Sequence, residues 1–371
     1  MARAWKDLYS QLVLGARERK ELLSASFELT SRCNLQCKMC YVSCSANDKQ
    51  VKARELTTNQ WIHLAEEARD AGLLFLTLTG GEVFIREDFK TIYEKFMSLG
   101  FIIKIFTNGT MITPDIVNWL ATMPPSVVSI TLYGASRETY QKVTGYAEGF
   151  DKTVRAIDDL IAKGIPTEIK TTVIQGNMHE FDQLLDFARQ RGLTLGIVNY
   201  VSPNREGCNS DPLGNRLSPQ ELVQYETHLE KRVKQLASEN MASLSKINDA
   251  VAEDIPSKLK DDRQNDQSRS THAFTCMSGL CAAWVTWDGR MLLCGILNVP
   301  HTNPFEKGFL TAWEELKHKC TGIPVCKECQ ECQYQSFCEH CPARLYNETG
   351  HYDQSAPYLC ELARRRKEVN A

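Results

Sequence analysis

The stretch SFELTSRCNLQCKMC, residues 26–40, joins a short β-rich run to three closely spaced cysteines. Three residues separate Cys33 from Cys37, and two separate Cys37 from Cys40. A tetrahedral zinc site or a cysteine-bound iron–sulfur cluster ordinarily takes four protein ligands. Three thiolates therefore leave one metal corner open for a small molecule, unless Cys44 completes a structural zinc site.

Short β-rich runs alternate with helical patterns on either side of this stretch, between residues 25 and 202. The expected strands are residues 26–30, 73–79, 101–107, 127–133, 166–174 and 193–201. The expected helices between them include residues 57–72, 86–100, 150–164 and 180–192. This alternation predicts repeated βα units around a parallel sheet, an α/β fold with a partial (β/α)6 TIM-type barrel. In such a barrel the chemistry lies on loops that follow the strands, and the cysteine triplet lies on the first of them.

The chain of 371 residues is too long for one average domain. Residues 218–245 predict a long polar helix, and residues 257–273 are charged and lack apolar periodicity. Residues 276–294 predict a hairpin that turns at Asp288 and Gly289. We therefore expect four parts. They are an N-terminal extension (1–23), the barrel (24–215), a helical connector with a flexible loop (216–273), and a small cysteine-rich domain with a β-hairpin and short helices (274–371).

Charge and hydropathy exclude several classes of protein. The net charge is −3 and the pI about 6.3, so nothing indicates a dedicated nucleic-acid or anionic-membrane binder. The N-terminus lacks a long apolar run with a small-residue cleavage site, which argues against a signal peptide. No stretch approaches ~18 uninterrupted apolar residues. We expect a cytoplasmic protein that spans no membrane.

Fifteen cysteines need an explanation other than disulfides, because the cytosol keeps thiols reduced. Four lie near the start of the chain, Cys208 stands alone, and the other ten lie between Cys276 and Cys360. Buried cysteines acting as small apolar residues would not bunch at two- and five-residue spacings among charged neighbours. Metal binding is the better interpretation of the two groups.

A second motif, Thr79-Gly80-Gly81-Glu82, follows the second expected strand. Two glycines let the backbone approach a ligand closely, and Glu82 offers an acceptor to an ammonium group. With this motif and the cysteine triplet, residues 24–202 resemble the radical S-adenosylmethionine (SAM) superfamily. The resemblance implies that Cys33, Cys37 and Cys40 hold a [4Fe–4S] cluster whose fourth iron is chelated by SAM. It also implies reductive cleavage of SAM to methionine and a 5′-deoxyadenosyl radical, which abstracts a hydrogen atom from the substrate.

The resemblance assigns SAM contacts to residues at several strand ends. Gly80, Gly81 and Glu82 would bind the methionine amine. Asn108 and Thr131 match polar positions that line the SAM pocket. Lys170 matches a position for the SAM carboxylate, with an exposed strand lysine as the alternative. The family usually has an aromatic residue just before the third cysteine, whereas this chain has Met39 there and Tyr41 just after.

The C-terminal cysteines are similar to the SPASM extension of radical SAM enzymes, in which seven cysteines help to hold two auxiliary [4Fe–4S] clusters. The cysteine quartet departs from the usual pattern only in its last interval, which is two residues instead of three. The resemblance assigns the first auxiliary cluster to Cys276, Cys294 and Cys341, with Cys281 well placed to complete it. It assigns the second to Cys329, Cys332, Cys338 and Cys360.

Other interpretations of these cysteines stay open. Zinc-ribbon-like CxxC pairs are one alternative. Cys326 forms a competing CxxC with Cys329, so the ligand register of the second cluster is ambiguous. We expect Cys320 and Cys44 to be bystanders.

The resemblance implies hydrogen abstraction from a peptide or protein, giving a thioether, a carbon–carbon crosslink or a dehydrogenated product, with the auxiliary clusters accepting electrons. In sulfatase-maturing members an aspartate follows the second hairpin cysteine, and Gly295 stands here instead. Too few residues precede Cys33 for a leader-binding domain, so a leader peptide would need a separate binding protein or direct docking. The reductant would be of flavodoxin or ferredoxin type. The alternatives are a redox-neutral epimerase in which Cys208 returns a hydrogen atom, a small-alcohol dehydrogenase, and a non-catalytic iron–sulfur or zinc protein.

Overall fold

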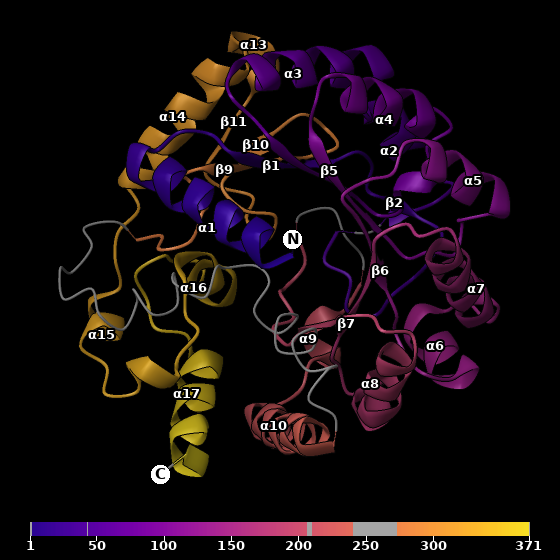
Figure 1. Cartoon of the computed structure of the whole chain (residues 1–371). Coiled ribbons are helices and arrows are strands. Elements are labelled where there is room, and N and C mark those ends of the chain that lie inside the picture. The colour runs from indigo at the N-terminus through magenta and orange to yellow at the C-terminus, as the bar shows by residue number, and fades with distance from the viewer. Residues whose placement is uncertain (1, 43, 206–209, 240–272, 371) are drawn as a thin grey trace.

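A computed structural model describes residues 2–42, 44–205, 210–239 and 273–370 of the chain (Figure 1). Within these ranges the main sheet has the strand order β11-β10-β9-β1-β4-β5-β6-β7-β8. Its parallel barrel strands are β1 (Ser24–Glu28), β4 (Phe75–Thr79), β5 (Ile102–Thr107), β6 (Val127–Thr131), β7 (Thr167–Thr172) and β8 (Leu195–Val198). Each overlaps a strand expected from the sequence, and the predicted α/β fold with a partial barrel is confirmed.

Helices form an arc around the outside of this sheet (Figure 1). They are α3 (Thr58–Asp70), α4 (Phe89–Ser98), α5 (Pro114–Thr122), α6 (Arg137–Thr144), α7 (Gly149–Ala162) and α8 (Phe181–Gln190). Local sequence sets their starts. In α3 the Thr57 side chain accepts a hydrogen bond from the backbone of Gln60, and the Gln60 side chain accepts one from the backbone of Thr57. This reciprocal cap satisfies two amide groups that the helix leaves unpaired.

The alternation of side chains along β1 determines what reaches the barrel interior. Phe27 is fully buried, and its ring centroid lies 5.3 Å from that of Trp61 on α3 and 6.0 Å from that of Phe96 on α4. Phe27 therefore faces the helices. Because successive strand residues point to opposite faces, Glu28 faces the interior of the barrel.

Short elements surround the loop that follows β1. They are β2 (Arg32–Cys33), β3 (Cys44–Ser45), α2 (Lys49–Arg54), η1 (Val83–Ile85) and η2 (Met178–Glu180). The strands β2 and β3 pair in parallel, with Cys33 opposite Ser45. The two ends of the cysteine loop are thereby tied together.

The C-terminal region extends the barrel sheet. Strand β9 (Ala282–Val285) pairs in parallel with β1 and antiparallel with β10 (Met291–Leu292), which pairs with β11 (His301–Thr302). The predicted hairpin is confirmed, and Gly289 adopts φ +92° in its turn, a conformation that favours glycine. The following elements are α13 (Pro304–Lys307), α14 (Phe309–Thr321), α15 (Lys327–Gln330), η3 (Gln335–Phe337), α16 (Pro342–Thr349) and α17 (Pro357–Asn370).

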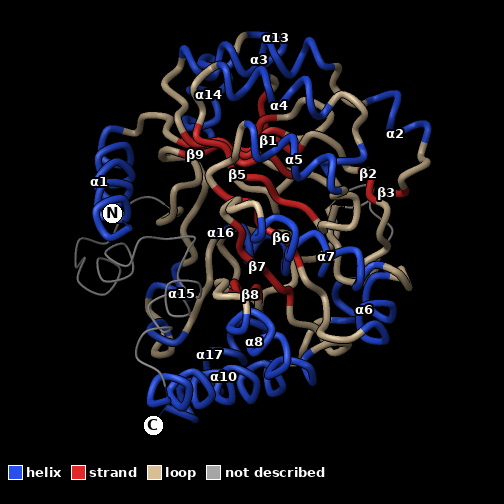
Figure 2. Tube along the Cα trace, turned by 45° about the vertical axis from the view of Figure 1, so that its right-hand side comes forward, coloured by secondary structure: helices blue, strands red, loops and turns tan. Residues whose placement is uncertain are grey.

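The remaining helices connect the two regions. Helix α10 (Pro219–Glu239), which follows the short α9 (Pro212–Asn215), starts where the long polar helix was expected and packs beside α17 (Figure 2). An ion pair between Arg366 and Glu226 joins these two helices. Helix α1 (Ala2–Arg19) was not among the expected elements, and it packs Val13 and Ala16 against Cys281.

Of the charged segment 257–273, all but the last residue lies outside the described residues. None of the helices in the described ranges has the length and apolar character needed to cross a membrane.

Candidate active site

The three cysteines of the first loop lie together at the C-terminal end of the barrel. Cys33 and Cys37 are buried and Cys40 is partly exposed, in a cluster with Leu35 and Met39. Burial, with the nearby Glu82 carboxylate and Cys40, raises the pKa of the Cys33 thiol to about 12. Burial and then the neighbouring Cys40 and Cys33 raise the pKa of Cys37 well above its usual value. Such thiols stay protonated without a cation, so the site is suited to a bound metal centre that keeps them as thiolates.

Hydrogen bonds from two directions orient Cys33. The backbone amide of Leu35 donates to its sulfur at 3.4 Å, and Asn108 Nδ2 approaches the same sulfur at 3.7 Å. Asn108 is itself held, because its Oδ1 accepts from the amide and hydroxyl of Thr110 and its Nδ2 donates to Asn34. The structure thus brings the predicted SAM-pocket residue Asn108 to the cysteine loop.

Glu82 is fully buried beside these residues. Its carboxylate accepts hydrogen bonds from Thr107 Oγ1 at 2.7 Å, Asn108 N at 2.8 Å and Phe84 N at 3.2 Å. Burial nevertheless raises its pKa above the usual value, since these donors only partly replace water. Glu82 therefore joins the ends of β4 and β5 next to the cysteine triplet.

The two glycines before Glu82 pack directly on the chain that leads into Cys33. A Cβ on Gly80 would lie 2.3 Å from the carbonyl oxygen of Thr30, and one on Gly81 would lie 2.3 Å from that of Arg32. Backbone hydrogen bonds join the same segments, from Gly81 N to Thr30 O and from Glu82 N to Arg32 O. The sequence predicted close approach to a ligand; the structure places the cluster loop's own backbone against both glycines.

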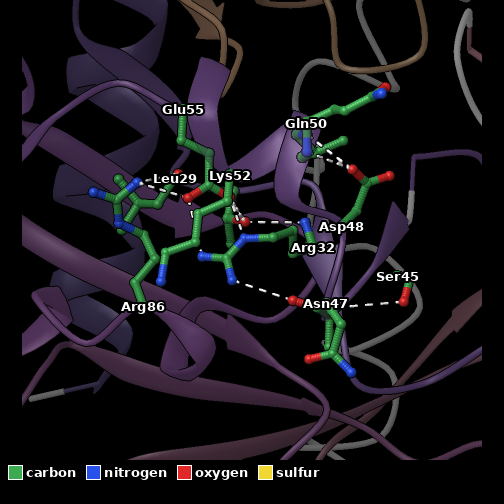
Figure 3. A network of polar contacts seen from close by, with 12 residues as sticks. Leu29, Arg32, Ser45, Asn47, Asp48, Gln50, Lys52, Glu55 and Arg86 are labelled. Carbon is green, nitrogen blue, oxygen red and sulfur yellow. Dashed lines mark hydrogen bonds and ion pairs between the residues drawn. The ribbon is translucent and has the colours of Figure 1, made fainter.

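A buried ion-pair network holds the outer side of this loop (Figure 3). Arg32 donates to both carboxylate oxygens of Glu55, at 2.8 and 3.0 Å, and Arg86 lies 3.6 Å from the same carboxylate. Arg86 also donates to the Leu29 carbonyl at 3.0 Å. Side-chain exposure is 5–8% for these three charged residues. Because Arg32 precedes Cys33 directly, the network fixes one end of the cysteine triplet. This network could not be predicted from local sequence, since Glu55 lies 23 residues away from Arg32.

Thr131 and Lys170 are neighbours on adjacent strands, as their pairing in the β6–β7 register shows. The Lys170 ammonium lies 3.8 Å from Glu168 and 4.4 Å from the ring centroid of Phe106. Burial raises the pKa of Glu168, but Lys104 at 2.8 Å and then Lys170 outweigh burial and hold that pKa below its usual value. Two lysines thus share one carboxylate inside the barrel, which leaves one positive charge in excess there.

The C-terminal cysteines gather into two groups. In the first, Cys276 and Cys341 both add to the effect of burial that raises the pKa of Cys294 to about 12. Burial and Cys276 likewise raise the pKa of Cys281 to about 12 and the pKa of Cys320 to about 11. Cys281 also contacts α1. The Cys320 sulfur also packs on the hairpin loop, where a Cβ on Gly279 would lie 2.5 Å from it. Cys320, expected to be a bystander, is therefore a neighbour of the first group.

The second group contains the four predicted cysteines and Cys326. Burial raises the pKa of Cys329, and Cys326 next to it raises it further, with Cys338 and Cys360 also contributing. Burial and Cys332 raise the pKa of Cys360, and Cys326 contributes there too. Five thiols thus lie in one group, so the structure does not decide which four of them would hold the second cluster, as the sequence had indicated.

Within the described ranges, no three or more His, Cys, Asp or Glu side chains lie close enough to hold one metal ion. A four-iron cluster binds its thiolates at separate irons, so its cysteines surround a volume rather than converge on a point. Cys33, Cys37 and Cys40, which lie together on the first loop, are the type of ligand that such a cluster takes. Cys208 lies outside the described residues.

A partial barrel with three thiolates after its first strand defines a class of iron–sulfur enzymes that bind a small cofactor at the open corner. A family model for the radical SAM superfamily matches residues 27–188. The AdoMet-dependent heme synthase of Methanosarcina barkeri is 30% identical over 357 residues, which cover 90% of this chain and 95% of that protein. This chain therefore belongs to the radical SAM superfamily.

Two further comparisons concern a partial relative and a solved structure. Mycofactocin maturase MftC of Mycolicibacterium smegmatis is 31% identical over 185 residues, 50% of this chain and 46% of that protein. The crystal structure of Streptococcus suis SuiB bound to precursor peptide SuiA matches with a TM-score of 0.67 and 15% identity, over 94% of this chain and 79% of that one. With its clustered cysteines, the C-terminal region is of the SPASM type.

Proposed function

We propose that this chain is a radical SAM oxidoreductase that modifies a peptide or protein by net oxidation. One observation carries the proposal: Cys33, Cys37 and Cys40 lie together on one loop, beside Glu82. If these three thiolates hold a cluster, its fourth ligand position would be left to SAM. A reduced [4Fe–4S] cluster and SAM bound there would supply a 5′-deoxyadenosyl radical that abstracts hydrogen from the substrate. The reductant would be a flavodoxin- or ferredoxin-type protein.

The chain's own residues would bind and orient this centre. Burial of Cys33 and Cys37 would exclude water from the cluster, and the side-chain amide of Asn108, which lies 3.7 Å from the Cys33 sulfur, would donate to that thiolate. Glu82 and its glycines would hold the methionine amine, Thr131 would line the SAM pocket, and Lys170 would neutralise the SAM carboxylate. The excess positive charge beside Glu168 supports this last role.

Net oxidation requires an acceptor for the second electron, and we assign it to two auxiliary clusters. The first would be held by Cys276, Cys281, Cys294 and Cys341, and the second by Cys329, Cys332, Cys338 and Cys360. The close grouping of these thiols supports the assignment. The redox-neutral alternative would depend on Cys208, which lies outside the described residues.

The substrate class has support of two kinds. MftC is named as a maturase, and SuiB was crystallised with its precursor peptide, which supports a peptide substrate. The second candidate is a reaction of heme formation on a porphyrin substrate. This candidate is favoured by the length of the alignments, because the heme synthase aligns with 90% of this chain whereas MftC aligns with 50%.

Anaerobic reconstitution tests the reaction class. The reduced protein should convert SAM to 5′-deoxyadenosine, and triple replacement of Cys33, Cys37 and Cys40 by Ala should abolish this conversion. The triple variant should still bind about eight irons where the wild type binds about twelve, as expected for three four-iron clusters. Cleavage of SAM by the triple variant, or zinc in place of iron, would refute the assignment.

Substrate assays then separate the two classes. Short peptides encoded beside the gene and porphyrin precursors of heme are each incubated with the reduced enzyme and SAM. Loss of two hydrogen atoms from a peptide, seen by mass spectrometry, would support peptide oxidation. Appearance of the heme absorption spectrum would instead support the porphyrin reaction.

A further inference from the structure

A buried ion pair inside the barrel is not used by any role assigned above. Glu28, the last residue of β1, is 1% exposed, and Arg205, in the loop after β8, is 5% exposed. Arg205 Nη2 donates to both oxygens of the Glu28 carboxylate, at 2.6 and 2.7 Å. Removing two charges from water costs several kcal/mol for each ion, so a buried pair is an inefficient means of stabilising a fold. Its retention at the active-site end of the barrel calls for another role.

On one side this pair touches the loop of the SAM-binding cysteines. The backbone amide of Arg205 donates to the carbonyl of Tyr41 at 3.0 Å, and its guanidinium lies 5.7 Å from the centroid of the Tyr41 ring. Tyr41 directly follows Cys40, the third cysteine of the triplet. Any displacement of Arg205 is therefore transmitted to a residue covalently joined to that cysteine.

On the other side the same pair touches the auxiliary-cluster hairpin. Arg205 Nη1 donates to the carbonyl of Gly295 at 3.3 Å, and Gly295 directly follows Cys294. Trp284 on β9 donates from its indole nitrogen to Glu28 at 3.0 Å. A Cβ on Gly295 would lie 2.8 Å from the Trp284 ring, so only glycine lets the indole lie against this backbone. The position that holds an aspartate in sulfatase-maturing enzymes is thus packed under Trp284.

We propose that Glu28, Arg205 and Trp284 form a clamp that fixes the distance between the SAM-binding cluster and the first auxiliary cluster. Arg205 is the positioning residue. Its planar guanidinium has separate donors for Glu28 and for the Gly295 carbonyl, and its backbone amide donates to the carbonyl of Tyr41. Electron transfer through protein slows steeply with distance, so a fixed separation keeps oxidation of the substrate radical fast. This inference rests on the proposed function, since it requires both clusters.

The test compares variants of the whole reconstituted protein. Arg205→Met alone leaves the Glu28 carboxylate buried without its counter-charge, which is expected to reduce folding. The informative variant is therefore the double change Glu28→Leu with Arg205→Met, which removes both charges and is close to neutral for stability. Trp284→Phe removes only the indole donor. The control is Arg137→Gln, which breaks an exposed ion pair with Asp151 on the outside of the barrel.

The readout is pulsed EPR of the reduced protein, which reports the spin–spin interaction between the SAM-binding cluster and the auxiliary cluster and needs no substrate. Iron content and melting temperature are measured alongside. Wild type and the Arg137 control should give one narrow distribution of intercluster distances. The double variant should keep its iron and melting temperature but lose that narrow distribution, and Trp284→Phe should lose part of it. A structural role alone would change the melting temperature and leave the distances as they are.

Two other results have distinct meanings. If the double variant keeps the wild-type distance distribution, the clamp is overturned while the proposed function stands. If wild-type protein shows the SAM-binding cluster alone, with about four irons, the auxiliary clusters are overturned and the clamp with them.

Discussion

Replacing Gly81 by alanine tests whether the paired glycines serve the cysteine loop. The added Cβ would lie 2.3 Å from the carbonyl oxygen of Arg32 and 2.6 Å from that of Ser31, whereas ordinary contact begins at 3.4 Å. Both are backbone atoms and cannot rotate away, so the chain at residues 31–32 must move by about 1 Å. Cys33 is the next residue and moves with it. A misplacement of about 1 Å in a catalytic centre can lower the rate about 100-fold.

The assay is the rate of 5′-deoxyadenosine formation by reduced protein, with iron content and the EPR spectrum of the SAM-binding cluster measured on the same samples. We expect Gly81→Ala to retain the auxiliary clusters and to lose most SAM cleavage. Gly322→Ala is the matched control, because its added Cβ would lie 3.6 Å from the nearest atom, in ordinary contact. Its backbone φ of −82° also suits alanine, so this variant should behave as wild type.

Two results would contradict this reasoning in different ways. Wild-type cleavage and an unchanged cluster spectrum in Gly81→Ala would show that the close approach is not required. An unchanged cluster spectrum without SAM, combined with weaker SAM binding, would show that Gly81 serves the cofactor rather than the loop.

Three further predictions address the proposed clusters and the buried network. Cys360→Ala should still cleave SAM but give little oxidised product for each 5′-deoxyadenosine, because it removes a proposed ligand of the second auxiliary cluster; near-normal product would exclude an electron relay. Cys281→Ser should lose about four irons and Cys320→Ser none, if Cys281 completes the first auxiliary cluster; the opposite iron contents would assign Cys320. Glu55→Gln should destabilise the protein by about 3–5 kcal/mol, since it leaves the buried Arg32 without its carboxylate partner, while Arg86 keeps Asp88 at 2.7 Å. Thermal unfolding followed by circular dichroism should show little change in the control Glu66→Gln, whose carboxylate is partly exposed.

Local patterns in the sequence were sufficient to predict the barrel. Strand and helix periodicities depend on neighbouring residues, so the six strands and the helices α3, α4, α7 and α8 could be located within a few residues. Helices α5 and α6 were not among the expected elements. The position of the cysteine triplet followed from the same pattern, since loops after parallel strands meet at one end of a barrel. Helix α1 was not predicted, because its buried residues Val13 and Ala16 pack against Cys281, which is distant in the sequence.

Contacts between distant residues could not be predicted in this way. Glu28 and Arg205 are 177 residues apart, and neither stands in a motif. The glycine pair was recognised, but its partner was not, because only the folded backbone shows that Gly81 faces Arg32. Cys320 was set aside for the same reason, since its closeness to Gly279 depends on how α14 packs on the hairpin.

The hairpin joins the barrel because the barrel is incomplete and has an open edge at β1. A six-stranded partial barrel leaves β1 as an edge whose unpaired backbone groups would recruit another chain. Strand β9 covers that edge, pairing Ser24 with Ala282 and Phe27 with Val285. The same register brings Trp284 beside Ser26, from where its indole reaches Glu28 at the next inward-facing position. The pairing of β9 with β1 therefore does two things: it protects the edge of the sheet, and it brings the hairpin cysteines toward the proposed SAM site. Loss of the hairpin would expose β1 and would also remove Cys276, Cys281 and Cys294, which are proposed ligands of the first auxiliary cluster.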